Sequence, residues 1–142
     1  EESAWELYTL EPKVDDSTGQ GRLVTLDQPV ALSTLVKRIK QHLGLDHVRV
    51  AEAGKRQVRT IALCAGAGGS VVGGRAADVY FTGEMRHHDV LAANANRISV
   101  VLCDHTNTER PYLKVLARRL RQDVSGTKFI LSRADREPLR VV

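Results

Sequence analysis

The sequence has few cysteines, few aromatic residues and no long apolar run, and these absences exclude several classes of protein. Two cysteines in 142 residues cannot form the disulfide framework of a small secreted domain. No apolar stretch approaches the roughly 18 residues that span a bilayer, and the N-terminus lacks the pattern of a signal or transit peptide. We therefore expect a cytoplasmic protein, with the nucleus or mitochondria as further locations, and no membrane partner.

The charges show no strong excess of one sign. The 21 lysines and arginines exceed the 17 acidic residues by four. Basic groups lie at 37–40 and 118–121 without aromatic residues between them, a pattern typical of solvated helix faces, so nucleic acid is not an expected partner. With 42% apolar residues, the composition is that of a globular domain, and the length suffices for one hydrophobic core.

Hydrophobic periodicity predicts a single α/β domain over 1–142, with a mixed sheet, a parallel βαβ core and flanking helices. Alternation of apolar and polar residues predicts two strands, and three short apolar runs predict parallel strands covered on both faces. The expected strands are 4–10, 21–26, 58–64, 77–82, 98–103 and 128–131. The expected helices are 31–43, a short one near 70–74, 85–95 and 109–122, and Gly44 should end the first of them.

Polar loops follow the three apolar strands, at 65–70, 82–89 and 104–109. Ligands of a parallel sheet bind outside the carboxyl ends of its strands, where such loops converge. We therefore expect the three loops to meet at one edge and to form the functional site there.

The first loop contains Gly66, Gly68, Gly69 and Ser70. Backbone N–H groups of such a loop can bind an anion at the start of a helix. The loop lacks the Gly-Lys-Ser/Thr ending of a P-loop, and Val71 stands where a dinucleotide fingerprint has its last glycine. A tight turn between strand and helix explains the same residues.

In the third loop, His105 and Glu109 are four residues apart and lead into a helix. An imidazole nitrogen and a carboxylate oxygen at this spacing can bind zinc, manganese or iron together. The other interpretation is a surface histidine beside a carboxylate that the helix dipole favours. Pro111 fits the first turn of the predicted helix.

The second loop contains Glu84 and the neighbouring pair His87 and His88. Adjacent residues on a helix do not share a face, so this pair is not expected to bind one ion. Glu84 and His88 are candidates for acid–base catalysis; the alternative is that one histidine of the pair caps local backbone and the other is solvated. Cys64 and Cys103 each end an apolar run and are predicted to be reduced core thiols rather than nucleophiles.

Taken together, four motifs resemble the C-terminal half of the Ngg-interacting-factor-three-like family, also known as the GTP cyclohydrolase I type II family. The motifs are GQGR at 19–22, CAGAGGS at 64–70, ADVYFTGEMRHHD at 77–89 and HTNTER at 105–110. The closing segment 135–139 looks like the eukaryotic branch. The resemblance implies a two-domain α/β protein that forms dimers and toroidal hexamers around dinuclear metal centres.

The resemblance also implies a role for two residues. In the family, a His-His pair and an aspartate from the N-terminal half join a histidine and a glutamate near the C-terminus, which His105 and Glu109 match. His87 and His88 do not correspond to the earlier pair. The chain would then be the C-terminal part of a longer protein with two of five ligands, and the isolated part is expected to be inactive. The implied functions are a hydrolase for nucleotide-like substrates, with two ions per full-length subunit, or an interaction module of a transcriptional co-regulator.

Overall fold

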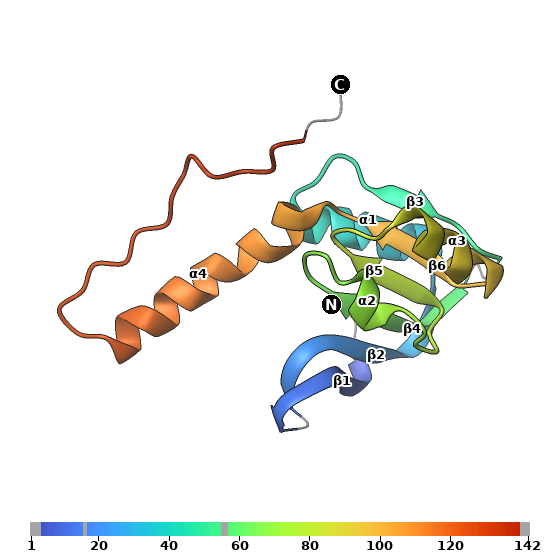
Figure 1. Ribbon diagram of the computed structural model, residues 1–142, viewed down its shortest axis with the longest axis horizontal. Helices are drawn as coiled ribbons and strands as arrows, with labels where there is room; N and C mark the ends of the chain where they lie inside the picture. The colour runs from blue at the N-terminus through green and yellow to red at the C-terminus, as the bar shows by residue number, and fades with distance from the viewer. Residues whose placement is uncertain (1–3, 16, 55–56, 140–142) are drawn as a thin grey trace.

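The computed structural model describes residues 4–15, 17–54 and 57–139, which form one six-stranded mixed sheet with helices on both faces (Figure 1). The strand order is β1-β2-β4-β5-β6-β3. The strands are β1 (Ala4–Asp15), β2 (Thr18–Ala31), β3 (Arg49–Ala51), β4 (Gln57–Cys64), β5 (Val79–Thr82) and β6 (Ser99–Leu102). The helices are α1 (Leu32–Leu43), α2 (Gly69–Val72), α3 (His87–Ala95) and α4 (His105–Asp123).

The predicted parallel core is confirmed. Strands β4, β5 and β6 are adjacent and parallel, whereas β1, β2 and β3 pair antiparallel with their neighbours. In register, Cys64 lies beside Thr82, which lies beside Leu102. The three strands therefore end level with one another, and their following loops leave the sheet at one edge.

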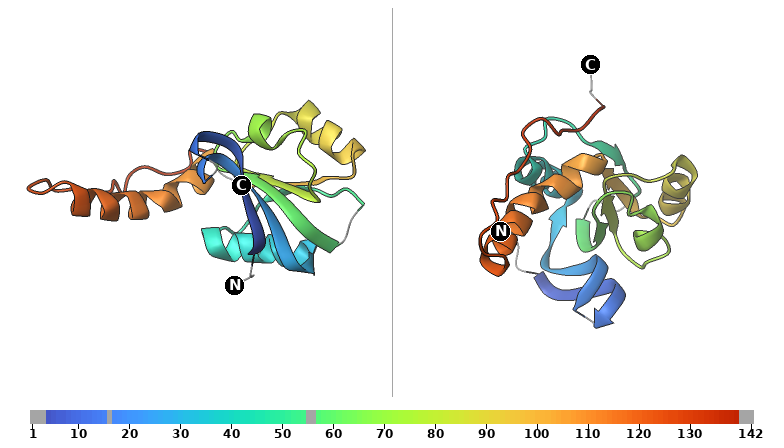
Figure 2. Two further views of the ribbon diagram at one scale, coloured as in Figure 1. Left: turned by 90° about the horizontal axis from the view of Figure 1, so that it is seen from below. Right: turned by 60° about the vertical axis from the view of Figure 1, so that its left-hand side comes forward.

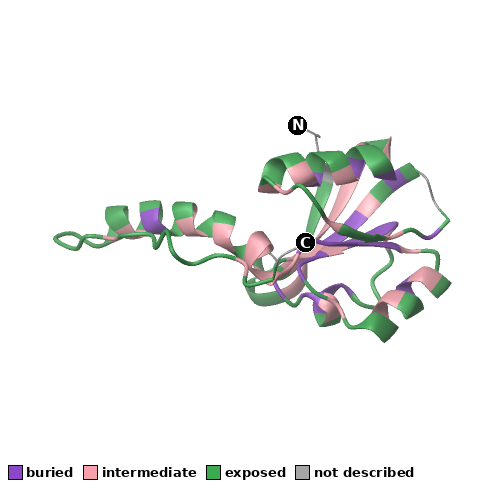
Figure 3. Ribbon diagram, turned by 90° about the horizontal axis from the view of Figure 1, so that it is seen from above, coloured by how far each residue is buried: buried purple, intermediate pink, exposed green. Residues whose placement is uncertain are grey.

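Two apolar clusters occupy the two faces of the sheet. Successive residues of one strand belong to different clusters, as Ile61 and Ala62 do, because successive side chains of a strand point to opposite faces. Helix α1 covers one face, and α2 with α3 covers the other (Figures 2 and 3). The buried side chains of α1 are Leu32, Leu35 and Ile39, which pack into the core. Gly44, with a φ of 68°, ends this helix as predicted.

Several predicted elements differ from those found. The segment 128–131 is not a strand, so that prediction was wrong: its backbone lies beside α4, where Arg121 Nη2 donates to the Phe129 carbonyl at 2.9 Å. Helix α4 begins at His105 rather than Glu109, which moves Pro111 into the second turn. The short strand β3 was not predicted, because three residues are too few for a periodic signal.

Helix α4 leaves the edge of the sheet and projects from the body (Figure 1). The segment after it turns back, and Arg110 contacts the Asp135 carboxylate and donates to the Ser132 carbonyl at 3.0 Å. The start of α4 therefore lies at the strand ends, while its later turns extend beyond them. No helix in the described part of the chain has both the length and the apolar character needed to cross a membrane.

Candidate metal centre at the strand ends

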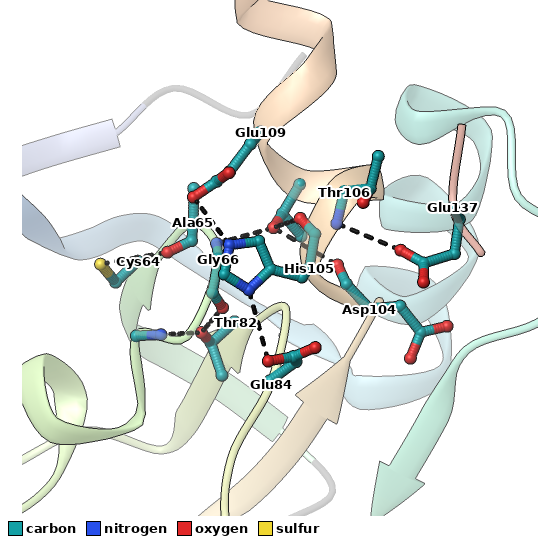
Figure 4. Close-up of polar contacts among 12 residues, drawn as sticks. Cys64, Ala65, Gly66, Thr82, Glu84, Asp104, His105, Thr106, Glu109 and Glu137 are labelled. Atoms are coloured by element: carbon teal, nitrogen blue, oxygen red, sulfur yellow. Dashed lines mark hydrogen bonds and ion pairs between the residues drawn. The ribbon is translucent and has the colours of Figure 1, made fainter. Parts of the chain in front are cut away.

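His105 lies between two carboxylates at the carboxyl ends of the parallel strands (Figure 4). Its Nδ1 is 3.3 Å from Glu84 Oε2, and its Nε2 is 3.2 Å from Glu109 Oε1. All three side chains are about half exposed. The structure thus brings together two residues predicted as metal ligands and one predicted as catalytic.

The local sequence explains how these residues meet. His105 and Glu109 occupy the first turns of α4, where residues four apart are neighbours on the helix surface. Glu84 follows β5, the strand beside β6, and its backbone N–H donates to the Gly66 carbonyl at 3.0 Å. The first contact follows from the helical spacing, and the second from the pairing of β5 with β6.

The glycine loop after β4 lies against His105 and Glu109. Gly66 has a φ of +66°, and a Cβ there would lie 2.3 Å from Glu109 Oε1 and 3.0 Å from His105 Nε2. The Gly66 N–H donates to Thr108 Oγ1 at 2.8 Å, and the Gly66 carbonyl accepts a bond from Thr82 Oγ1 at 3.1 Å. Glycine is required at this position because of both its backbone conformation and the closeness of the two side chains.

Two amides of the loop are already bonded within the chain. The Gly66 amide is held by Thr108, and the Gly68 amide donates to Thr82 Oγ1 at 3.0 Å. These bonds are those of a tight turn between strand and helix. Gly69 and Ser70 start the single turn of α2, and anion binding by this loop stays a prediction.

The surroundings of His105 raise its pKa above the usual value. The largest cause is the hydrogen bond with Glu84, and the charges of Glu109 and Glu84 act in the same direction. Partial desolvation opposes them. The protonated imidazole is therefore favoured more than in an isolated histidine, and a metal ion would have to compete with that proton.

The structure does not bring His88 to this centre. Its side chain is 70% exposed, and its Nε2 is 3.6 Å from Asp89 Oδ1. Asp89 in turn accepts a bond from Arg86 Nε at 2.7 Å, which lowers the pKa of Asp89. His87 lines a separate hollow of about 240 Å³ beside β3 and α3. The catalytic role of His88 stays a prediction.

Neither cysteine is in a disulfide. Cys103 is buried, and loss of water around the thiol raises its pKa to about 11. Cys64 is only half-buried, less than predicted, because it ends β4 where the sheet opens toward the loops. Burial also raises the pKa of Cys64. Both thiols have the character of packing groups rather than activated nucleophiles.

The described residues contain no group of three or more histidine, cysteine, aspartate or glutamate side chains that could hold one metal ion. The reason lies in the imidazole ring, since Glu84 and Glu109 contact its two different nitrogens. Each nitrogen therefore faces one carboxylate, and the pair formed by His105 Nε2 and Glu109 Oε1 comes from one helix. Two atoms that bind one tetrahedral zinc ion at about 2.1 Å lie roughly 3.4 Å apart, close to the observed 3.2 Å.

Sequence reasoning missed the hydroxyl groups that hold the centre together. Thr82 bonds both Gly66 and Gly68, and Thr108 bonds the Gly66 amide and, at 2.8 Å, the His105 carbonyl. The sequence shows that Thr82 ends an apolar run and that Thr108 precedes Glu109. The sequence does not show that both threonines bond to Gly66, because 42 residues separate Gly66 from Thr108.

Comparisons with known proteins agree with this fold and these motifs. The family model Duf34/NIF3 (NGG1p interacting factor 3) matches residues 4–138. The chain belongs to this family. It is 49% identical to NIF3-like protein 1 of Rattus norvegicus over 96% of the chain and 38% of that protein. It is 34% identical to NGG1-interacting factor 3 of Saccharomyces cerevisiae over 97% of the chain and 50% of that protein.

The fold of this NIF3-family chain is also found in solved structures. The Bacillus cereus protein related to NIF3 superposes with a TM-score of 0.69 at 24% identity, covering 87% of this chain and 36% of that one. The eukaryotic relatives bear out the resemblance derived from the motifs. The chain spans about two fifths of the length of the first of them.

Proposed function

We propose that this chain supplies part of a divalent metal centre in a metal-dependent hydrolase, with His105 and Glu109 as two of the ligands. The observation that carries the proposal is the 3.2 Å separation of His105 Nε2 and Glu109 Oε1, beside Gly66, where a Cβ would lie 2.3 Å from that carboxylate oxygen. Imidazole and carboxylate together suit zinc, manganese or iron.

Glu84 is proposed to hold the ring rather than the metal. By accepting a hydrogen bond from His105 Nδ1–H, its carboxylate keeps the proton on that nitrogen and leaves the Nε2 lone pair for the ion. Metal-binding histidines usually have such a partner on their second nitrogen, where it fixes the ring and increases its basicity. The proposed role of Glu84 is therefore positioning, in contact with a ligand.

A bound ion would supply a water of lowered pKa and polarise an oxygen of the substrate. Two protein ligands are fewer than the three that catalytic zinc sites usually have, so we propose that residues outside this chain complete a dinuclear centre. The chain covers 38% of its rat relative, which is consistent with such a contribution. The proposed substrate class is nucleotide-like, with the loop starting at Gly66 near its anionic group. His88 is proposed to assist proton transfer, and its exposed side chain beside Asp89 supports this role less than the contacts of His105 and Glu109 support theirs.

Titration of the metal-free full-length protein with Zn²⁺ or Mn²⁺ tests the proposal. His105→Ala should lose at least one ion while the fold stays intact, because a half-exposed side chain contributes little packing. Glu84→Gln should weaken binding by about ten-fold or more, as other outer-shell substitutions do. His47→Ala removes an exposed histidine elsewhere and is the control. Unchanged stoichiometry and affinity in His105→Ala would show that this histidine is not a ligand.

The alternative that we propose is a protein-interaction module of a transcriptional co-regulator. The name of the yeast relative, NGG1-interacting factor 3, favours it, and so do Tyr112 and Leu116, which are apolar yet exposed on α4. Binding to purified NGG1 that persists in a chelator and in His105→Ala would support this function. Binding that needs the metal would argue against it. Sedimentation of the same samples tests the proposed dimer or hexamer.

A further inference from the structure

Asp104 has a backbone conformation that is almost restricted to glycine. Its φ of 63° and ψ of 158° lie in a region that other residues adopt only when the surrounding structure holds them there. In the described chain, Arg97 is the only other non-glycine residue with a positive φ. Cys103 and Asp104 connect the end of β6 to His105, so the dihedral angles of Asp104 help to set the direction in which α4 and His105 leave the sheet.

Helix capping does not explain an aspartate at this position. Asp104 is the N-cap of α4, where an aspartate side chain normally accepts a bond from the first turn. Here the side chain makes no cap hydrogen bond. The Thr106 N–H in that turn instead donates to Glu137 Oε2 at 3.2 Å.

The Asp104 carboxylate points to the edge strand of the sheet. Its Oδ1 accepts a bond from Arg49 Nη2 at 2.6 Å, and Arg49 belongs to β3, which pairs with β6. The Asp104 carbonyl lies 3.4 Å from Thr108 Oγ1, but the hydroxyl hydrogen of Thr108 has a nearer acceptor in the His105 carbonyl at 2.8 Å. The contact that holds the strained residue is therefore the one between its side chain and Arg49.

We propose that Arg49 and Asp104 are positioning residues for His105. The proposal rests on the function proposed above, in which His105 is a metal ligand. The Arg49 side chain holds Asp104 in its strained conformation, and that conformation directs the imidazole toward Glu84, Glu109 and Gly66. Strand β3, the shortest of the sheet, thereby acts on the metal centre without touching it.

The effect of charge alone has the opposite sign, which makes the proposal testable. Arg49 is a cation near a site for cations, so its removal should strengthen metal binding if only Coulomb interactions mattered. Under the proposal, Arg49→Gln weakens binding, because Asp104 relaxes and the ring moves. The Arg49 side chain is 65% exposed, and an exposed ion pair contributes modestly, so we expect a loss of about five-fold in affinity.

A glycine at position 104 should restore the Zn²⁺ affinity that Arg49→Gln lowers. Glycine adopts the required dihedral angles without being held, so the double variant Arg49→Gln/Asp104→Gly should bind Zn²⁺ as the unaltered protein does. The double variant Arg49→Gln/Asp104→Ala lacks both the ion pair and the glycine and should stay weak. Arg59→Gln, an exposed arginine on β4, is the control for the loss of one positive charge.

Two measurements on the intact protein decide the question: Zn²⁺ affinity by calorimetry, and the imidazole nitrogen shifts of His105 by NMR without metal. Arg49→Gln should move the His105 shifts, and Asp104→Gly should return them. Unmoved shifts and affinity, or failure of the glycine to restore them, would overturn the positioning role. If the unaltered protein bound no Zn²⁺, the proposed function would fail, while the metal-free shifts would still confirm or refute the action of Arg49 on His105.

Discussion

Gly66→Ala should separate the stability of this fold from the integrity of its candidate metal centre. Position 66 has a φ of +66°, and an L-residue in the left-handed region costs about 1 to 2 kcal/mol. Alanine recovers about 0.4 to 1 kcal/mol by restricting the unfolded chain. The net loss of unfolding free energy is therefore about 1 kcal/mol, which lowers the Tm by about 2 to 5 °C in a domain of this size.

The added methyl group should also disturb the ligands. It would lie 2.3 Å from Glu109 Oε1, so the carboxylate has to move by roughly 1 Å to reach van der Waals distance. Glu109 is half exposed and can make this movement at little cost in stability. A metal site, however, tolerates displacements of only about 0.5 Å. We therefore expect Zn²⁺ affinity to fall by about ten-fold or more, in the range of other disturbances around metal ligands.

Gly74→Ala is the matched control. Gly74 has a φ of +75°, and a Cβ there would meet nothing within 4 Å. Both variants should therefore lose similar stability in thermal unfolding, and only Gly66→Ala should lose metal affinity in calorimetry. Equal affinity in the two variants would refute the placement of the ion beside Gly66. An unchanged Tm in both would refute the argument from backbone strain.

Two further predictions concern titration and thiol reactivity. Glu84 and Glu109 raise the pKa of His105 above 6.5. The stability that protonation of His105 adds should therefore be present below pH 6.5 and be lost as the pH rises through the raised pKa, and metal affinity should rise over the same interval. An NMR titration giving His105 a pKa below 6.5 would contradict this. A thiol reagent should label Cys64 before Cys103 in the native protein, since Cys103 is buried and has a pKa of about 11, and labelling of Cys103 at the rate of a free thiol would show that β6 opens.

Local patterns determined much of this protein. The apolar runs that became β4, β5 and β6 could be recognised because strands covered on both faces need apolar side chains on both. Their common edge followed from the alternation of strand and helix, since strands joined by helical crossovers are parallel and end at the same edge. The contact of His105 with Glu109 followed from a spacing of four residues, which brings two side chains together on any helix.

The tertiary structure alone decided which distant groups complete the centre. Glu84 reaches His105 across 21 residues, and Arg49 reaches Asp104 across 55, and no periodicity encodes such pairs. The segment 128–131 has the composition of a strand but meets no strand edge, because the chain reaches it at the end of a helix that projects from the sheet. A strand needs a partner for its backbone hydrogen bonds. The sequence determined the local spacing and burial, and the packing of the sheet decided which side chains surround His105.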